Sequence, residues 1–492
     1  MKLLQSVLFA MVFLFGSQSF SQDNVFLKRE FWKTQPSPEV IKAKIKAGHD
    51  PSEANAGNFD GVVIATLQGA PLKSIIYLQS QKGNDVNKLT HDGRTYIFWA
   101  AYKGNVELME HLLKQGAKTD IKDDHGLTAL NFAANAGVTN TKVYDICLKH
   151  GANLEKDLNQ DGANALLLAI SKDDDLSLTK YFTSKGLKID SKDANGNDAF
   201  NYVARTGKIA LMDKLFKQGI KGNNQAFLFA AYGTRGKTNG LEVYQFLEEK
   251  GLNPKTTNQE GISPLHIVAA RSKNPEIINY FLNKGLNVNA QDHNGNTPFL
   301  NAASRNNLKI IDLLFNKVKN INQSNKKGET ALMLATEGNH PEVVNFIIEK
   351  GANFKLANNR GNNVTYYLIN SFSDRNKDEF VKKLKLLKSA GLDIKSPQEN
   401  GNTWYHLAVE KQRLELLKIA AELNQDINAK NSEGNTALIL AAMKAQDDSI
   451  LKFLLAQGAD KSITTDFEET AYDLALENEL LKKNNISIDF LK

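Results

Sequence analysis

The chain is poor in cysteine, proline and tryptophan. Its single cysteine excludes an internal disulfide framework and any zinc or iron–sulfur site built from several cysteines. Only 10 prolines accompany 33 glycines, and 41% of the residues are hydrophobic, which excludes collagen-like and disordered classes for most of the 492 residues. The 61 basic and 55 acidic residues leave a net charge of +6, too small to indicate nucleic-acid binding.

The longest apolar run stands at the N-terminus. Residues 3–15 (LLQSVLFAMVFLF) follow a short basic start, and Ser19 and Ser21 occupy the −3 and −1 positions of a cleavage site. A run this short favours a cleaved export signal over a membrane anchor, which needs about 20 apolar residues. We expect cleavage after Ser21, a mature chain of 471 residues (492 minus 21), and a periplasmic or secreted location without membrane attachment. An uncleaved anchor is the alternative.

A residue that suits the end of a helix recurs about every 33 residues, after stretches whose apolar residues have helical spacing. The series is Gly48, Gly83, Gly116, Gly151, Gly186, Gly219, Gly251, Gly285, Val318, Gly351, Gly391, Asn424 and Gly458. Helices commonly end on a residue with left-handed backbone, which glycine adopts freely and asparagine tolerates. Asn424 therefore fits the series, whereas Val318 departs from it.

A second motif lies about ten residues after these positions. Its copies are HDGRTYIFWAA (91–101), DHGLTALNFAA (124–134), QEGISPLHIVAA (259–270), HNGNTPFLNAA (293–303), KKGETALMLAT (326–336) and SEGNTALILAA (432–442). Polar residues with a glycine predict a tight turn, and the following Ser or Thr is placed to cap a helix. Pro264 and Pro298 then occupy a first-turn position that tolerates proline. The small Ala pair allows close helix packing.

These motifs resemble the ankyrin repeat, in the form of an exported bacterial protein with a signal peptide. The resemblance covers Phe59 to the C-terminus, preceded by a half repeat at 38–48 (PEVIKAKIKAG). It implies an all-α solenoid of about 12 to 13 stacked helix pairs with projecting β-hairpin fingers. Because one pair cannot bury its own apolar face, such an array is stable only as a stack.

The pattern divides the chain into six segments. They are a signal peptide (1–21), an N-terminal cap with the half repeat (22–57), a first block of repeats (58–222), an atypical repeat (223–257), a second block (258–464) and a capping repeat (465–492). In the atypical repeat the turn motif is missing, and GTRGKTNG (233–240) is inserted between the two expected helices. A second insertion, SFSDRNKDE (371–379), also falls between helices.

Enzyme motifs are weak. Residues 231–238 (AYGTRGKT) match a permissive phosphate-binding loop around Lys237, but that loop requires a preceding buried strand, and NNQAFLFAA has the register of a first helix. The histidines form no metal-binding pair, and His266 and His406 occupy the position where the ankyrin family uses histidine to hydrogen-bond the turn. We therefore expect no enzyme activity, no cofactor and no bound metal.

Other single residues receive structural interpretations. Cys147 is expected to be a small buried hydrophobe, and the basic helix 382–388 (KKLKLLK) to present a solvated face. Four aromatic residues at or near first-helix starts, Trp99, Trp404, Tyr366 and Tyr367, could be exposed binding anchors or could stack between repeats. Trp32 is expected to cover the first repeat.

The resemblance implies that the protein binds another protein through its fingertips and concave face. Transferred by position, the candidate partner-binding residues are Gln259, Glu260, Ile262, Arg271, His293, Asn294, Asn296, Arg305, Lys326, Lys327, Glu329, Glu337, Asn400, Asn402 and Lys411. Their mixed charge favours a polar interface rather than a nucleic-acid surface. We expect a monomeric scaffold.

Two alternatives remain open. One is a periplasmic stress-protective protein, because some bacterial periplasmic ankyrin proteins that this chain resembles accompany catalases. The other is a nucleotide-binding switch that uses the loop at 231–238. Fold alone does not separate these functions.

Overall fold

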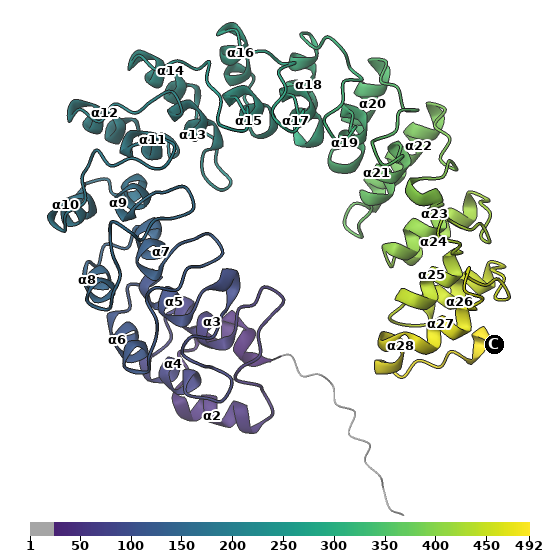
Figure 1. The fold of residues 1–492 in the computed structure, drawn as a ribbon, viewed down its shortest axis with the longest axis horizontal. Helices are drawn as coiled ribbons and strands as arrows, with labels where there is room; N and C mark the ends of the chain where they lie inside the picture. Colours follow the sequence, from purple (N-terminus) through teal and green to yellow (C-terminus); the bar gives the residue numbers. More distant parts are fainter. Residues whose placement is uncertain (1–23) are drawn as a thin grey trace, which may run out of the picture. The chain divides into compact units, whose positions relative to one another are not determined.

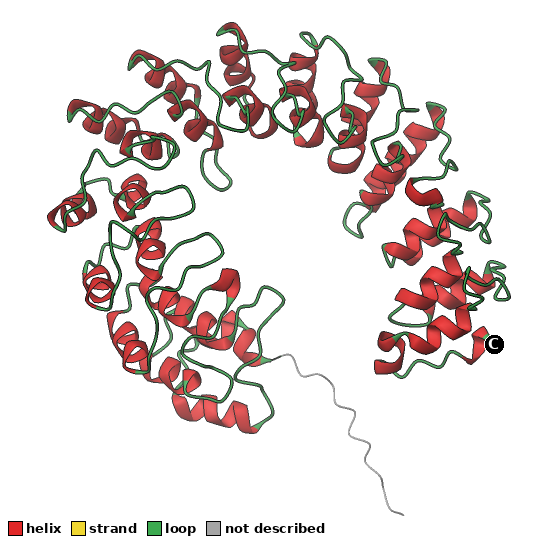
Figure 2. Cartoon of the chain, viewed as in Figure 1, coloured by secondary structure: helices red, strands yellow, loops and turns green. Residues whose placement is uncertain are grey.

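The computed structural model describes residues 24–492, so the predicted signal peptide and its cleavage site lie outside the described residues. All regular elements in the described part of the chain are helices, and its only β pairing is three isolated bridges (Figure 2). No helix among residues 24–492 combines the length and apolar character needed to cross a membrane. The all-helical prediction is confirmed.

The helices α3 to α28 form thirteen consecutive pairs, which is the upper count predicted. Before them stand η1 (Val25–Leu27), α1 (Arg29–Lys33) and α2 (Pro38–Lys46). The first helices of the pairs are α3 (Gly61–Gln68), α5 (Tyr96–Tyr102), α7 (Ala129–Ala136), α9 (Ala165–Ala169), α11 (Ala199–Ala204), α13 (Ala226–Tyr232), α15 (Pro264–Arg271), α17 (Pro298–Arg305), α19 (Ala331–Gly338), α21 (Val364–Asn370), α23 (Trp404–Glu410), α25 (Ala437–Lys444) and α27 (Ala471–Glu477). The second helices are α4 (Leu72–Gln79), α6 (Val106–Lys114), α8 (Lys142–Lys149), α10 (Ser177–Ser184), α12 (Ile209–Lys217), α14 (Leu241–Glu249), α16 (Pro275–Asn283), α18 (Leu308–Phe315), α20 (Pro341–Glu349), α22 (Lys377–Ser389), α24 (Leu414–Glu422), α26 (Ser449–Ala456) and α28 (Glu479–Lys483).

The chain divides into two compact units. The first contains the described residues up to Val203 together with Ala210–Gly222, and the second contains Ala204–Ile209 and Asn223–Lys492. The division at Gly222 and Asn223 falls where the sequence lacks a turn motif.

Within the second unit the helices form two layers. The first helices α13, α15, α17, α19 and α21 contact one another in series, and α14, α16, α18, α20 and α22 form a second series beside them (Figure 1). In the first unit α3, α5, α7 and α9 form one series, and α2, α4, α6 and α8 form the other. The core lies between these layers.

Helix α17 shows how the sequence produces a first helix. The Thr297 hydroxyl accepts a hydrogen bond from the Leu300 amide, and Pro298 follows in the first turn, so the helix start is capped. Ala302 and Ala303 are fully buried, and their small side chains allow α17 to pack between α15 and α19.

Helix ends follow the predicted series at Asn424, which has left-handed backbone (φ +49°). Val318 remains the exception, because α18 already ends at Phe315 and Val318 is not among the residues with positive φ.

At the start of the described chain, Trp32 is fully buried, and its indole nitrogen donates to the carbonyl oxygen of Phe26 at 2.8 Å. Because η1 and α1 both pack on α3, Trp32 has the predicted capping role.

The first predicted insertion lies between helices, because residues 233–240 connect α13 to α14. The second, 371–379, lies between helices only in part, because the connection from α21 to α22 runs from Ser371 to Asn376. The remaining inserted residues extend α22 to 13 residues. One correction concerns this helix: Lys383 is only 2% exposed, so the basic segment 382–388 is not solvated throughout.

Candidate functional site

The loop that precedes a first helix, here called a finger, is held by one side chain. In the finger before α17, the Asp292 Oδ1 atom accepts hydrogen bonds from the amides of Asn294 (2.9 Å) and Asn296 (2.8 Å). The Asp292 amide donates to the carbonyl oxygen of Asn296, and Gly295 takes φ +76°. The same two-bond pattern recurs at Asn258, Asn325, Asn358 and Asn431.

The prediction of β-hairpin fingers therefore requires a correction. None of the fingers in residues 24–492 contains a regular strand. The Asp or Asn side chain accepts hydrogen bonds from the main-chain amides that would otherwise pair in a strand ladder. The turn from Asp292 to Asn296 spans only five residues, which is too short for such a ladder.

Adjacent fingertips in the second unit are joined through the main chain. The His293 amide donates to the Glu260 carbonyl (2.8 Å), and the Lys326 amide donates to the Asn294 carbonyl (2.8 Å). The Asn359 amide likewise donates to the Lys327 carbonyl oxygen (2.9 Å). We call the exposed residues on this support the fingertip row: Gln259, Glu260, His293, Asn294, Lys326, Lys327 and Asn359. Their side chains project from a backbone fixed at every repeat.

The structure exposes most candidate partner-binding residues. Eleven of the fifteen are exposed: Gln259, Glu260, Arg271, His293, Asn294, Arg305, Lys326, Lys327, Glu337, Asn400 and Lys411. Ile262, Asn296 and Glu329 are half-buried, and Asn402 is buried. The exposed set divides between fingertips and the ends of first helices.

Two of the less exposed candidates hold neighbouring fingers together. The Asn402 side-chain oxygen accepts a hydrogen bond from Asn431 Nδ2 (2.9 Å), and the Asn296 side-chain oxygen accepts one from Asn325 Nδ2 (3.0 Å). These residues therefore support the fingertips. Asn402 is buried, so its side chain does not present a surface to a partner.

A polar cluster around Tyr367 involves three candidate residues. Glu329 lies in the finger before α19, and Glu337 and Lys411 lie at the ends of α19 and α23. The Tyr367 hydroxyl, on α21, donates to Glu329 Oε1 (3.3 Å) and accepts from Asn358 Nδ2 (2.8 Å). Although Glu337 is exposed as a residue, neighbouring groups desolvate its carboxyl group, and this desolvation together with the nearby Glu329 carboxylate raises its pKa, whereas Lys411 opposes that rise. The cluster presents a carboxylate, Glu337, that forms no ion pair with any described residue. The sequence places Tyr367 near a helix start as a possible anchor or stacking residue, but does not indicate this polar role. Tyr367 is 2% exposed, so it is not an exposed anchor.

His266 and His406 have structural roles, as predicted. The Ser263 amide donates to His266 Nδ1 (3.2 Å), and His266 Nε2 lies 3.0 Å from the Ala290 carbonyl oxygen. His406 similarly accepts from the Thr403 amide (3.2 Å) and lies 2.9 Å from the Asn435 carbonyl oxygen. Burial lowers the pKa of both imidazoles. Each histidine thus joins its own helix start to the next finger.

The tryptophans at helix starts are packed rather than exposed. Trp404 is 2% exposed, and its ring lies 6.4 Å from that of Phe380, on α22 of the preceding repeat, in an edge-to-face arrangement. Trp99 is also buried, and its ring lies 5.7 Å from Phe132 in an edge-to-face arrangement. The stacking interpretation is therefore confirmed, and the anchor interpretation is wrong for both residues.

Cys147 is fully buried, and burial raises the pKa of its thiol to about 12. A thiol that stays protonated at neutral pH is a poor nucleophile. This confirms its interpretation as a small core hydrophobe. Among residues 24–492 no group of three or more His, Cys, Asp or Glu side chains is arranged to hold a metal ion.

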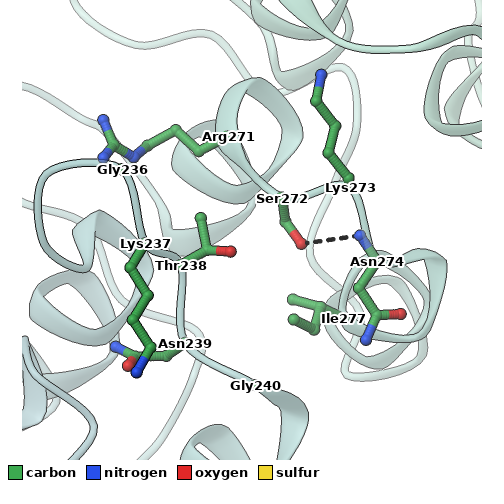
Figure 3. Close-up of a pocket in the computed structure, with 10 residues that line it drawn as sticks. All are labelled: Gly236, Lys237, Thr238, Asn239, Gly240, Arg271, Ser272, Lys273, Asn274 and Ile277. Carbon is green, nitrogen blue, oxygen red and sulfur yellow. Dashed lines mark hydrogen bonds between the residues drawn. The ribbon is translucent and has the colours of Figure 1, made fainter.

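A pocket of about 650 Å³ lies in the second unit, between the inserted loop and the connection from α15 to α16 (Figure 3). It is lined by Gly236, Lys237, Thr238, Asn239, Gly240, Arg271, Ser272, Lys273, Asn274 and Ile277. Arg271 was a candidate from the sequence, whereas Ser272, Lys273, Asn274 and Ile277 were not. The inserted loop marks a departure from the repeat in the sequence, but the sequence alone does not say which neighbouring residues the loop covers.

The structure lacks the local arrangement that a phosphate-binding loop requires. The segment before the loop is helix α13 instead of a strand, and Lys237 stands four residues before the start of α14 at Leu241. The Lys237 amide and carbonyl are both used in pairing with Thr234 inside the loop. The loop therefore does not present its backbone amides at a helix N-terminus.

Comparisons with known proteins agree with the repeated helix pairs. A family model described as ankyrin repeats (3 copies) matches residues 62–156, 227–325, 265–358, 300–384 and 368–465. The chain is 23% identical over 223 residues to the human transient receptor potential cation channel subfamily A member 1, which is 45% of this chain and 17% of the channel. It is 26% identical over 132 residues to a fowlpox virus protein described as an ankyrin repeat protein, which is 26% of this chain and 68% of that protein.

Proposed function

Because the chain belongs to the ankyrin repeat family, we propose that it is a non-catalytic scaffold that binds another protein through the second unit. The observation that carries this proposal is the fingertip row, whose backbone is joined from finger to finger by hydrogen bonds of 2.8 to 2.9 Å. The partner would contact this row together with the exposed ends of the first helices at Arg271, Arg305, Glu337 and Lys411.

The arrangement suits recognition of a protein surface. A backbone fixed before binding loses little conformational entropy when its side chains are covered. The first-helix ends change from basic at Arg271 and Arg305 to acidic at Glu337 and back to basic at Lys411. Such an alternation favours a partner with a matching sequence of charges, because like charges placed opposite one another oppose binding.

We also propose that this binding occurs outside the cytoplasm. The support is the sequence of residues 1–21, with its basic start, short apolar run and small residues before Gln22. Mass spectrometry of the N-terminus from the native source tests this directly, since a cleaved chain begins at Gln22. A chain that retains Met1 would contradict cleavage of a signal peptide, and recovery of that chain in the cytoplasmic fraction would contradict the export proposal.

Affinity capture with the mature chain, residues 22–492, tests the binding surface. The test variant carries Arg271→Glu, Arg305→Glu, Lys327→Glu and Lys411→Glu, all at exposed positions. The matched control carries Lys309→Glu, Lys385→Glu, Lys388→Glu and Lys418→Glu, which are exposed on second helices. We expect one dominant protein to be captured by the unchanged chain and the control, and lost with the test variant. Equal capture by both variants would contradict the proposed face.

A further inference from the structure

The inserted loop and the next repeat bring together an excess of positive charge around the pocket. Arg235 and Lys237 lie on the loop, Arg271 ends α15, and Arg305 ends α17. All four are exposed, and within residues 24–492 their side chains form no hydrogen bond or ion pair. Lys273 also lines the pocket, but its ammonium group donates only to neutral oxygens, the Arg305 carbonyl (3.2 Å) and Asn306 Oδ1 (3.0 Å).

Three acidic residues stand in the adjoining segments. They are Glu242 at the start of α14, Glu260 in the finger before α15, and Glu276 in the first turn of α16. None forms an ion pair with the pocket cations in the described chain. Three of the cations, Lys237, Arg271 and Lys273, line the pocket itself and no carboxylate does, so the lining is positive while its surroundings carry both charges.

The polar groups of the pocket are not arranged to enclose one small anion. Lys237, Arg271 and Lys273 point away from one another around the rim (Figure 3). The start of α16 is already satisfied, because Ser272 Oγ accepts from the Asn274 amide (3.2 Å) and Asn274 Oδ1 accepts from the Glu276 amide (2.9 Å). An isolated phosphate could therefore contact one cation at a time.

We propose that this pocket binds an acidic peptide segment of the protein partner. An extended peptide can place carboxylates at several separated cations while an uncharged residue enters the pocket beside Thr238 and Ile277. It can also place neutral or basic residues near Glu242, Glu260 and Glu276. A uniformly charged phosphate backbone would meet those three carboxylates, so nucleic acid fits less well. This inference rests on the proposed scaffold function and names the chemistry of one contact.

Fluorescence anisotropy with a labelled peptide tests the site. The probe is a 12-residue synthetic peptide of alternating Glu and Gly with one central Leu, added to the mature chain. The pocket variant is Arg235→Glu with Lys237→Glu, two exposed loop positions that the four-residue capture variant leaves unchanged. The matched control is Lys385→Glu with Lys388→Glu, which places the same charge change on α22.

We expect the pocket variant to weaken peptide binding about tenfold or more, and the control variant to leave it unchanged at physiological salt. Equal weakening by both variants, or no measurable binding to the unchanged chain, would overturn the pocket. Competition with inorganic phosphate and with a single-stranded oligonucleotide forms the third arm. Displacement of the peptide by either at lower concentration than unlabelled peptide would overturn the assignment to a peptide.

The two experiments fail separately. If capture depends on the four-residue variant but the peptide does not bind, the scaffold function stands and the acidic-segment proposal is wrong. If the peptide binds at the pocket but no partner is captured by the unchanged chain, the broader scaffold proposal loses its support. Circular dichroism and the unfolding midpoint of each variant establish that the loop substitutions leave the helices folded.

Discussion

The buried amide of Asn339 donates a 2.7 Å hydrogen bond to the carbonyl oxygen of Asn306. Asn306 in turn donates to the Ser272 carbonyl at 2.9 Å, so the short connections of three repeats are linked in series. Asn339 also donates to the Ala303 carbonyl (2.9 Å), and its own oxygen accepts from the His340 amide (2.8 Å). One side chain therefore satisfies three main-chain groups that helix ends would leave unpaired.

Replacing Asn339 by alanine is expected to destabilise the second unit by about 2 to 4 kcal/mol, because buried main-chain groups lose their partners. Urea unfolding followed by circular dichroism measures the change. Asn316→Ala is the matched control, because Asn316 is exposed at the end of α18. A loss no larger than that of the control would show that these links add little to stability.

The fingertip glycines permit a second comparison. Gly328 has φ +79°, and a Cβ atom there would lie 2.8 Å from the Asn359 amide nitrogen. Gly361 has φ +83°, but a Cβ atom there would meet nothing within 4 Å. Both substitutions by alanine carry a left-handed backbone cost of about 1 to 2 kcal/mol. Only in Gly328→Ala would the new Cβ atom also push its own fingertip away from the next one, at Asn359.

We therefore expect Gly328→Ala to destabilise the array by at least about 1 kcal/mol more than Gly361→Ala. Hydrogen exchange followed by mass spectrometry should show faster exchange of peptides that contain the Asn359 amide in the first variant. Similar exchange in both variants would mean that the fingertips are not held as the structure indicates.

Much of the fold was predictable because its signals are local. The helix ends, the capped helix starts and the two insertions follow from backbone preferences that glycine, threonine and proline express wherever they stand. Asn424 shows the strength of this reasoning, since it adopts the left-handed conformation that its place in the series predicted. Repetition then supplies the packing, because each pair buries the same face.

Contacts between repeats are what spacing alone does not decide. Trp99 and Trp404 stand where an exposed anchor was possible, yet neighbouring helices cover them. Asn402 sits at a turn but is turned toward Asn431. Lys383 is different, because it lies three residues after Phe380 and four before Leu387, both fully buried. That helical spacing places Lys383 on the buried face, so its burial was predictable.

The pocket required the structure. Its lining comes from an inserted loop and from the next repeat, 31 or more residues along the chain from Gly240 to Arg271. An insertion departs from the repeat, so the family pattern does not say where it folds. The candidate residue Arg271 was found from its position, but its neighbours Ser272 and Ile277 have no sequence signal of their own.

Lys383 provides a pH-dependent prediction. Its ammonium group is buried and donates to one acceptor, the Thr336 carbonyl oxygen (2.9 Å). Burial lowers its pKa from the ordinary 10.5, although Glu379 partly opposes this. Because the folded pKa is the lower one, the folded protein gains stability as pH rises from that value toward the unfolded value, and carries the full penalty below it.

Replacement of Lys383 by methionine should therefore stabilise the second unit at neutral pH, by roughly 1 kcal/mol or more, since methionine fills similar space without a charge. The gain should shrink as pH rises toward 10. Urea midpoints at pH 7 and at pH 9.5 measure both effects. The control is Lys382→Met, at an exposed neighbour on the same helix. A destabilised, pH-independent Lys383→Met variant would show that the ammonium contact is favourable.

His266 and His406 predict the response to acid. Each accepts a main-chain amide at Nδ1, so a proton there would face the Ser263 or Thr403 N–H group. The pKa of each is lowered by burial from 6.5, so stability is fully present above about pH 6.5 and is lost as pH falls through the folded values. We expect the urea concentration at the unfolding midpoint of the second unit to decrease as the pH is lowered from 7 to 5.

A double variant, His266→Gln with His406→Gln, should be less stable at pH 7.5 but should show a smaller decrease. The exposed His293→Gln is the control and should retain the full fall. If the double variant falls as steeply as the unchanged chain, other groups govern its acid sensitivity.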